Sequence, residues 1–169
     1  MADDPHEKLR EVIATRINTD YPAAMGTLPL QFPNRPKPQD AADGYIAISW
    51  QVGTSTSRGI HKAFEQTPVV IFGQVFVPKN TGTKKANQEA GLLAQVIREQ
   101  RYTVISNTPS TTQDPLPLDG ANQRDTVTSA NLRVYMPTVN AIGPDQGGQW
   151  YQVNMTAEAL FTVKYGETV

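Results

Sequence analysis

The order of elements between residues 69 and 97 is one that can bind a phosphate group. A strand-like run ends at Pro78, a polar turn follows, and a helix opens with Gly82-Thr83-Lys84-Lys85. Backbone amides at a helix N-terminus attract anions, so the pattern invites comparison with the phosphate-binding loop of nucleotide-binding proteins. That motif needs a glycine five positions before Gly82 and a lysine directly after it, where this chain has Val77 and Thr83. We therefore expect no nucleotide site. The turn is an ordinary helix cap, formed by Asn80, Thr81 or Thr83.

The two histidines are the next residues that could do chemistry. His61 lies close in sequence to Ser55 and Ser57, and an aspartate from elsewhere would complete the residue types of a hydrolase triad. The chain has no Gly-x-Ser-x-Gly motif, however, and we expect His61 to be solvated or at an interface. His6 has no histidine or cysteine at metal-ligand spacing. Neither histidine is predicted to be catalytic or to bind a metal.

Carboxylates and tryptophans complete the list of candidates. A glycosidase holds two carboxylates rigidly across a cleft, but the paired aspartates of this chain fall in predicted loops or at the terminus. These pairs are Asp3 with Asp4, Asp40 with Asp43, and Asp114 with Asp119. Trp50 and Trp150 each lie in an alternating strand, so we expect core or interface anchors rather than sugar-stacking platforms. The sequence predicts no catalytic residue, no cofactor and no metal.

Composition limits the remaining classes. The 169 residues fit one domain, residues 1–169, with a net charge of −1, which gives no sign of a polyanion-binding protein. The chain has no cysteine, which excludes disulfides and thiolate metal sites and fits a reducing compartment. Its N-terminus is acidic, unlike a signal peptide, and no apolar run approaches the roughly 20 residues of a membrane span. We expect a soluble protein made in a cytoplasm, without membrane contact.

Two amphipathic helices are predicted. The first covers about residues 5–18, because Asp4, Pro5 and Glu7 form a capping box and apolar residues recur at helical spacing. Its apolar stripe consists of Leu9, Val12, Ile13 and Ile17. The second helix extends to residue 97, with a stripe of Ala86, Ala90, Leu93 and Ile97. Both stripes should pack on a sheet.

The strands of that sheet are predicted from runs of β-branched and aromatic residues and from alternation. They cover residues 28–32, 45–52, 69–78, 102–106, 132–136 and 150–165. In the run 45–52, Ile46, Ile48, Trp50 and Val52 share the buried face. Residues 53–67 form either a long hairpin arm or a mobile loop, residues 107–126 a long polar loop, and residues 137–148 a turn region.

These elements predict an α+β domain with a mostly antiparallel sheet, two helices on one face, a long hairpin arm and long polar loops. The other face of the sheet is then uncovered. Open faces and edges of long-stranded sheets must be charged, covered or paired, and the strands of this chain carry few charges. Self-association is the expected consequence.

The same elements carry a family resemblance. They are an N-terminal amphipathic helix, a proline-rich loop, Tyr45-Ile46-Ala47-Ile48, a polar arm, Gly73-Gln74-Val75-Phe76-Val77-Pro78 with Gly82, a second helix, and Gly147-Gly148-Gln149-Trp150-Tyr151 opening the last strand. This order resembles the tail terminator proteins of long-tailed bacteriophages, also called tail completion or minor tail proteins. The segment 107–124 is longer than the corresponding connection of that family.

The resemblance implies a structural protein of the virion and no enzyme. Its members form a ring, commonly of six subunits, that caps the head-proximal end of the tail tube, ends tube polymerisation and offers a docking surface for the head. The implied partners are further copies of the chain, the tail tube protein and a head–tail connector protein. DNA passes through the lumen without sequence-specific binding. Assembly takes place in the host cytoplasm.

Candidate residues for these contacts come from two segments. We expect the arm residues Arg58, His61, Lys62 and Phe64 to contact a neighbouring subunit or the tube. Lys79, Lys84 and Lys85 are candidates for facing the lumen and its DNA, and with Arg58 and Lys62 they could form a basic rim. The alternative for the lysines is a solvated helix start.

Two other functions stay open at this point. One is a different ring protein of the head–tail connection, such as a head-completion or connector subunit. The other, from a different class, is a small-molecule binding or hydrolytic domain that uses the open face of the sheet.

Overall fold

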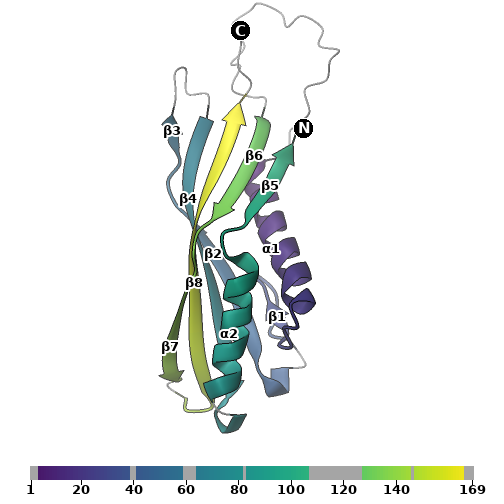
Figure 1. Cartoon of the computed structure of the whole chain (residues 1–169), viewed down its shortest axis with the longest axis vertical. Coiled ribbons are helices and arrows are strands. Elements are labelled where there is room, and N and C mark those ends of the chain that lie inside the picture. Colours follow the sequence, from purple (N-terminus) through teal and green to yellow (C-terminus); the bar gives the residue numbers. More distant parts are fainter. Residues whose placement is uncertain are drawn as a thin grey trace, which may run out of the picture.

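The computed structural model describes residues 4–38, 41–58, 64–81, 83–106, 127–145 and 147–165. Two helices, α1 (Pro5–Ala23) and α2 (Thr83–Ile97), accompany one large sheet (Figure 1). Its strands are β1 (Leu30–Gln31), β2 (Tyr45–Val52), β3 (Thr56–Arg58), β4 (Phe64–Pro78), β5 (Arg101–Ser106), β6 (Val127–Val134), β7 (Thr138–Pro144) and β8 (Trp150–Tyr165).

The two longest strands form the centre of the sheet. β4 and β8 pair antiparallel along their whole length, from Phe64 opposite Lys164 to Pro78 opposite Trp150. β2 and β3 follow one another along the outer edge of β4, while β6 and β7 follow one another along the outer edge of β8. In one half of the molecule the strand order across the sheet is therefore β3-β4-β8-β6-β5, and in the other half it is β1-β2-β4-β8-β7. Among the strand pairs in the described residues, the short β1–β2 contact alone is parallel.

Both helices lie on the same face of the sheet. Alternate residues of β4 and β8, such as Ile71 and Phe161, are fully buried beneath them. The helices contribute stripes of buried side chains at three- and four-residue spacing, as an amphipathic helix should. These are Leu9, Ile13, Ile17 and Tyr21 in α1 and Ala86, Glu89, Ala90, Leu93 and Ile97 in α2.

A glycine in β4 sets how closely α2 approaches the sheet. A Cβ atom on Gly73 would lie 2.4 Å from Leu93 Cδ2 and 3.1 Å from Met155 Cε. Since real Cβ contacts are not that short, only glycine lets the Leu93 side chain rest on the backbone of β4.

The predicted fold class is confirmed: the chain is α+β, with a mostly antiparallel sheet and two helices on one face. The bounds of β2 and β8 agree with the prediction, and the arm is a hairpin where β3 pairs with residues 64–66 of β4. Helix α1 continues five residues past the predicted end, because Tyr21 extends its buried stripe. Trp50 is only half-buried and Val52 is 38% exposed, so the predicted buried face of β2 ends at Ile48.

Three predictions about the strands are wrong. The predicted turn region 137–148 contains β7, and β6 begins at Val127 rather than at Leu132. β7 lies almost entirely in solvent and forms because it pairs with β8, so its sequence shows little of the apolar pattern that marks a strand. The predicted strand 69–78 also starts earlier, at Phe64, because its first residues pair with β3 and with β8.

Candidate interaction surface

The described part of the chain offers no cluster of metal ligands. Within it, no three histidine, cysteine, aspartate or glutamate side chains lie together in a way that could hold an ion. A search of the same residues finds no helix long and apolar enough to cross a membrane.

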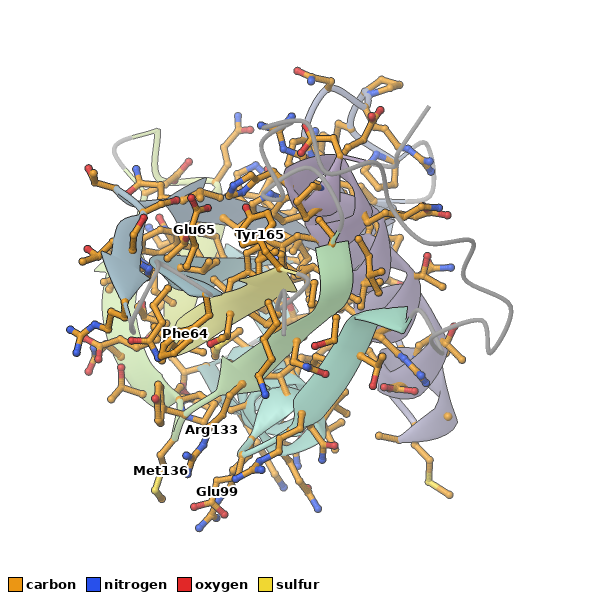
Figure 2. All side chains as sticks on the ribbon, turned by 90° about the horizontal axis from the view of Figure 1, so that it is seen from above. Phe64, Glu65, Glu99, Arg133, Met136 and Tyr165 are labelled. Atoms are coloured by element: carbon orange, nitrogen blue, oxygen red, sulfur yellow. The ribbon has the colours of Figure 1, made fainter. Side chains whose placement is uncertain are left out.

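Of the arm residues predicted to contact a neighbour, the two that the structure describes lie at one end of the sheet. Arg58 and Phe64 are directly opposite each other in the β3–β4 hairpin, the first exposed and the second half-buried. Figure 2 shows Phe64 and Glu65 at this end, where Glu65 accepts a hydrogen bond of 3.1 Å from the Tyr165 hydroxyl. His61 and Lys62 lie outside the described residues.

The candidate lumen lysines lie at the other end. Lys79 follows β4 in a 3₁₀ turn, where its backbone N–H donates to the carbonyl oxygen of Gln149 at 3.1 Å, and Lys84 and Lys85 open α2. The length of β4 separates them from Arg58, roughly 45 Å at about 3.3 Å per residue. The expectation of one basic rim formed by Arg58 and the lysines is therefore wrong for a single chain, because opposite ends of one strand cannot share a rim.

A buried polar cluster joins the two helices. Glu89 of α2 is 5% exposed and accepts hydrogen bonds from the hydroxyls of Tyr21 and Thr27, the latter at 2.5 Å. Burial, reinforced by the hydrogen bond to Glu89, raises the pKa of the Tyr21 hydroxyl well above its ordinary value. The sequence reasoning missed this cluster, although a glutamate within the apolar stripe of α2 was a usable signal.

The sheet face opposite the helices is open and carries few charges. Along the centre of β4 and β8 it presents half-buried aromatic, amide and hydroxyl side chains, among them Phe72, Gln74, Asn154 and Thr156. At one end, the Tyr45 ring stacks on Phe76 at 4.9 Å, and the Lys37 ammonium lies 4.2 Å from the centre of the Trp150 ring. Burial, followed by the charge of Asp145, raises the pKa of Tyr45. Trp150, predicted to be a core or interface anchor, thus faces outward on the open face.

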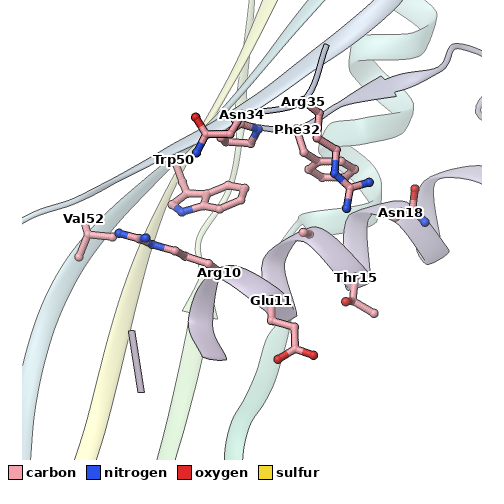
Figure 3. A pocket seen from close by; sticks show the side chains of 11 residues that line it. Arg10, Glu11, Thr15, Asn18, Phe32, Asn34, Arg35, Trp50 and Val52 are labelled. Atoms are coloured by element: carbon pink, nitrogen blue, oxygen red, sulfur yellow. The ribbon is translucent and has the colours of Figure 1, made fainter. Parts of the chain in front are cut away.

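A groove of about 720 Å³ runs between α1 and the outer edge of β2 (Figure 3). Arg10 extends across it toward Val52 and Trp50, while Arg35 lies beside Phe32. Neither arginine has an ion-pair partner among the described residues. Glu11 turns away and pairs with Lys8 at 3.1 Å. β1 pairs only with Ile46 and Ala47, so within the described chain no strand covers this edge of β2 over residues 48–52.

The sheet edge formed by β7, on the other side of the sheet from the β2 edge, is apolar and exposed. Tyr135 and Met136, between β6 and β7, are 39% and 61% exposed, and Val139 and Ile142 of β7 are 39% and 57% exposed. Met136 projects from the rim of the molecule in Figure 2. These large apolar side chains thus lie exposed along or next to one edge of the sheet.

Comparisons with known proteins inform only the fold. No protein-family model and no curated protein matches the chain. Nine chains of solved structures match. One of them, known only by a sequence identifier, is 16% identical, with a TM-score of 0.59 over 96% of this chain and 98% of that chain. At this identity the likeness establishes a shared fold across nearly the whole chain.

Proposed function

We propose that this chain is a structural protein of a long-tailed bacteriophage that forms a ring, six-membered by family resemblance, on the head-proximal end of the tail tube. The ring ends tube polymerisation and provides the docking surface for the head. Its partners are further copies of the chain, the tail tube protein and a head–tail connector protein, and it resides in the virion after assembly in the host cytoplasm.

The observation that carries this proposal is the unequal coverage of the sheet. Both helices lie on one face, whereas the other face and the β7 edge are open, poor in charge and partly apolar. A protein that works as a monomer protects such surfaces with charges, prolines or covering segments. A subunit of a closed ring instead buries them against neighbours.

Termination follows from a ring whose two faces differ. One face matches the stacking surface of the tube and binds it, while the other lacks that match, so no further tube ring can add. The two ends of β4 supply different groups to the two faces: the β3–β4 hairpin with Arg58 and Phe64 at one end, and Lys79, Lys84 and Lys85 at the other. Lysines next to the lumen would attract DNA phosphates without reading sequence.

The first test is the mass of the purified protein in solution. Size-exclusion chromatography with light scattering over a concentration series, with negative-stain images of any large species, should reveal closed rings. A monomer at every concentration, also in the presence of purified tube, would contradict the proposal.

A second test addresses the tube. A variant without residues 55–65 should stay folded but no longer cap tubes, and overlong tails should appear. Binding of the intact protein to purified tails rather than to filled heads separates a terminator from another ring protein of the head–tail connection.

A further inference from the structure

Among the edge strands that the structure describes, β7 lacks the charged side chains that protect such an edge against pairing with another chain. It holds no charged residue, whereas β5 begins with Arg101 and β3 ends with Arg58. Every residue of β7 except Gly143 is exposed. Its regular part is residues 138–141, before a bulge near Gly143 and Pro144 end it. Unpaired N–H and C=O groups on such an edge are ready to bind a strand.

The outer edge of β2 offers a matching surface on the other side of the same half. Beyond the two residues paired with β1, residues 48–52 have no strand partner in the described chain. Trp50 and Val52 lie there at the mouth of the α1 groove (Figure 3), with Val52 38% exposed. The open stretch has five residues, close to the four of the regular part of β7.

Strand directions decide how these two edges can meet. Each pair in the row β2-β4-β8-β7 is antiparallel, so β2 and β7 run in opposite directions at the two outer edges. Rotation about an axis near the strand direction preserves each strand's direction. The β7 edge of one copy then meets the β2 edge of the next copy antiparallel. Across the row, Thr138 is level with Ser49, so the strands must be inclined to the ring axis for β7 to shift past β1 and onto residues 48–52 of the next copy. A heterologous contact of this kind gives a ring when the rotation closes.

We propose that β7 of each copy adds as an antiparallel strand to the open edge of β2 in the next copy, so that the sheets of neighbouring subunits become continuous. This inference rests on the proposed ring and names the strands that join it. The occupant of the β2 edge is a second copy of this chain.

The side chains on the two edges are compatible on both faces of the joined sheet. On the helix face, Val139 of one copy would lie near Trp50 and Val52 of the next, which places apolar side chains together. On the open face, Thr138 and Asn140 would lie near Ser49 and Gln51, all uncharged. No like charges would be opposed, which favours the pairing.

Disulfide cross-linking tests this contact, because the natural chain has no cysteine. Single variants carry Thr138→Cys or Asn140→Cys on β7, or Ser49→Cys or Gln51→Cys on β2, all exposed positions on the open face. After mild oxidation, a 1:1 mixture of a β7 variant and a β2 variant should give covalent dimers in at least one of the four combinations. The double variant of that combination should give a ladder up to the size of the ring, and each single variant alone should give none.

A matched control uses two exposed positions on other edges, Ser57→Cys on β3 and Thr103→Cys on β5, which should not cross-link above background. Rings that light scattering detects but that no β7–β2 combination cross-links would overturn this inference and leave the proposed function standing. Dimers from a β7 variant alone would indicate a two-fold β7–β7 contact and also overturn it. A monomer under all conditions, with no cross-link, would remove both proposals.

Discussion

The hydroxyl of Tyr21 donates a hydrogen bond to the carboxylate of Glu89, which joins the last turn of α1 to α2 inside the core. The same hydroxyl accepts from the backbone N–H of Leu28 at 3.3 Å. The Tyr21 ring is also covered by Gly26, where any Cβ would lie 2.3 Å from a ring carbon. One buried polar contact therefore fixes the end of α1, the following loop and α2 together.

Replacing Tyr21 by phenylalanine should destabilise the protein. The ring is kept, but the buried Leu28 N–H loses its partner, and Glu89 is left with its hydrogen bonds from Thr27, so we expect a loss of about 1–3 kcal/mol. Urea unfolding measures this as a lower midpoint at unchanged slope. Thr19→Ala, which removes an exposed hydroxyl bonded to the Thr15 carbonyl at 2.8 Å, should change stability by less than about 0.5 kcal/mol. Equal effects of the two substitutions would show that the buried cluster adds no more to the free energy of unfolding than an exposed hydrogen bond.

Replacing Tyr102 by phenylalanine should stabilise the protein, in contrast to the change at Tyr21. Tyr102 is 7% exposed, and its hydroxyl has no hydrogen-bond partner among the described residues. Removing an unsatisfied buried hydroxyl should raise the free energy of unfolding by about 1 kcal/mol. Tyr165→Phe is the matched control, because that hydroxyl bonds to Glu65 and its removal should lower stability. A loss of stability in Tyr102→Phe comparable to that in Tyr165→Phe would contradict the assignment.

Tyr102→Phe should also change how the free energy of unfolding falls at alkaline pH. Burial, followed by the charge of Asp20, raises the pKa of Tyr102 to about 12, against an ordinary value of 10.0. The folded state therefore keeps this proton where the unfolded state has released it. The stability contributed by the protonated form is complete below pH 10 and is lost as pH rises toward 12. In Tyr102→Phe the fall over this window should be shallower, as unfolding curves at stepped pH will show.

Alternation along the chain was enough to predict β2 and β8, but not β7. β2 and β8 each have one face under the helices, so their sequences carry a period of two. In β7 both faces are exposed, and what holds the strand is the long partner β8. Such a strand has little hydrophobic alternation in its sequence. The segment between Pro137 and Gly148 is therefore predicted as a turn.

The candidate surface was less predictable than the fold for a related reason. Arg10 and Arg35 are far apart in sequence and share a groove only because α1 lies beside the outer edge of β2. Arg58 and Lys79 show the reverse case. A count of charges along the sequence takes no account of distance, and the extended length of β4 places these two residues at opposite ends of the sheet.

Replacing Gly73 by alanine should destabilise the packing of α2. The added methyl would overlap Leu93 Cδ2, so the helix or the side chain must move, at about 1–3 kcal/mol. Gly91→Ala in α2 is the control: nothing lies within 4 Å of its added Cβ, and helix propensity should make it stabilising by about 1 kcal/mol. Combining Gly73→Ala with Leu93→Ala should cost less than the sum of the two single changes. Strict additivity would mean that the two residues do not share this space.

Replacing Val139 by lysine should prevent ring formation without unfolding the subunit. Val139 is 39% exposed at the edge of the sheet, so a lysine side chain can reach water in the monomer and costs little stability. In the proposed contact the same position lies against Trp50 and Val52 of the next copy, where an ammonium group would be desolvated without a partner. Light scattering should therefore report monomers, while circular dichroism and the unfolding midpoint stay near those of the natural protein. Thr103→Lys, an exposed change on the β5 edge, should assemble normally. Rings formed as readily by Val139→Lys would show that this edge faces solvent in the assembly, and the joining strands would then have to be sought elsewhere on the sheet.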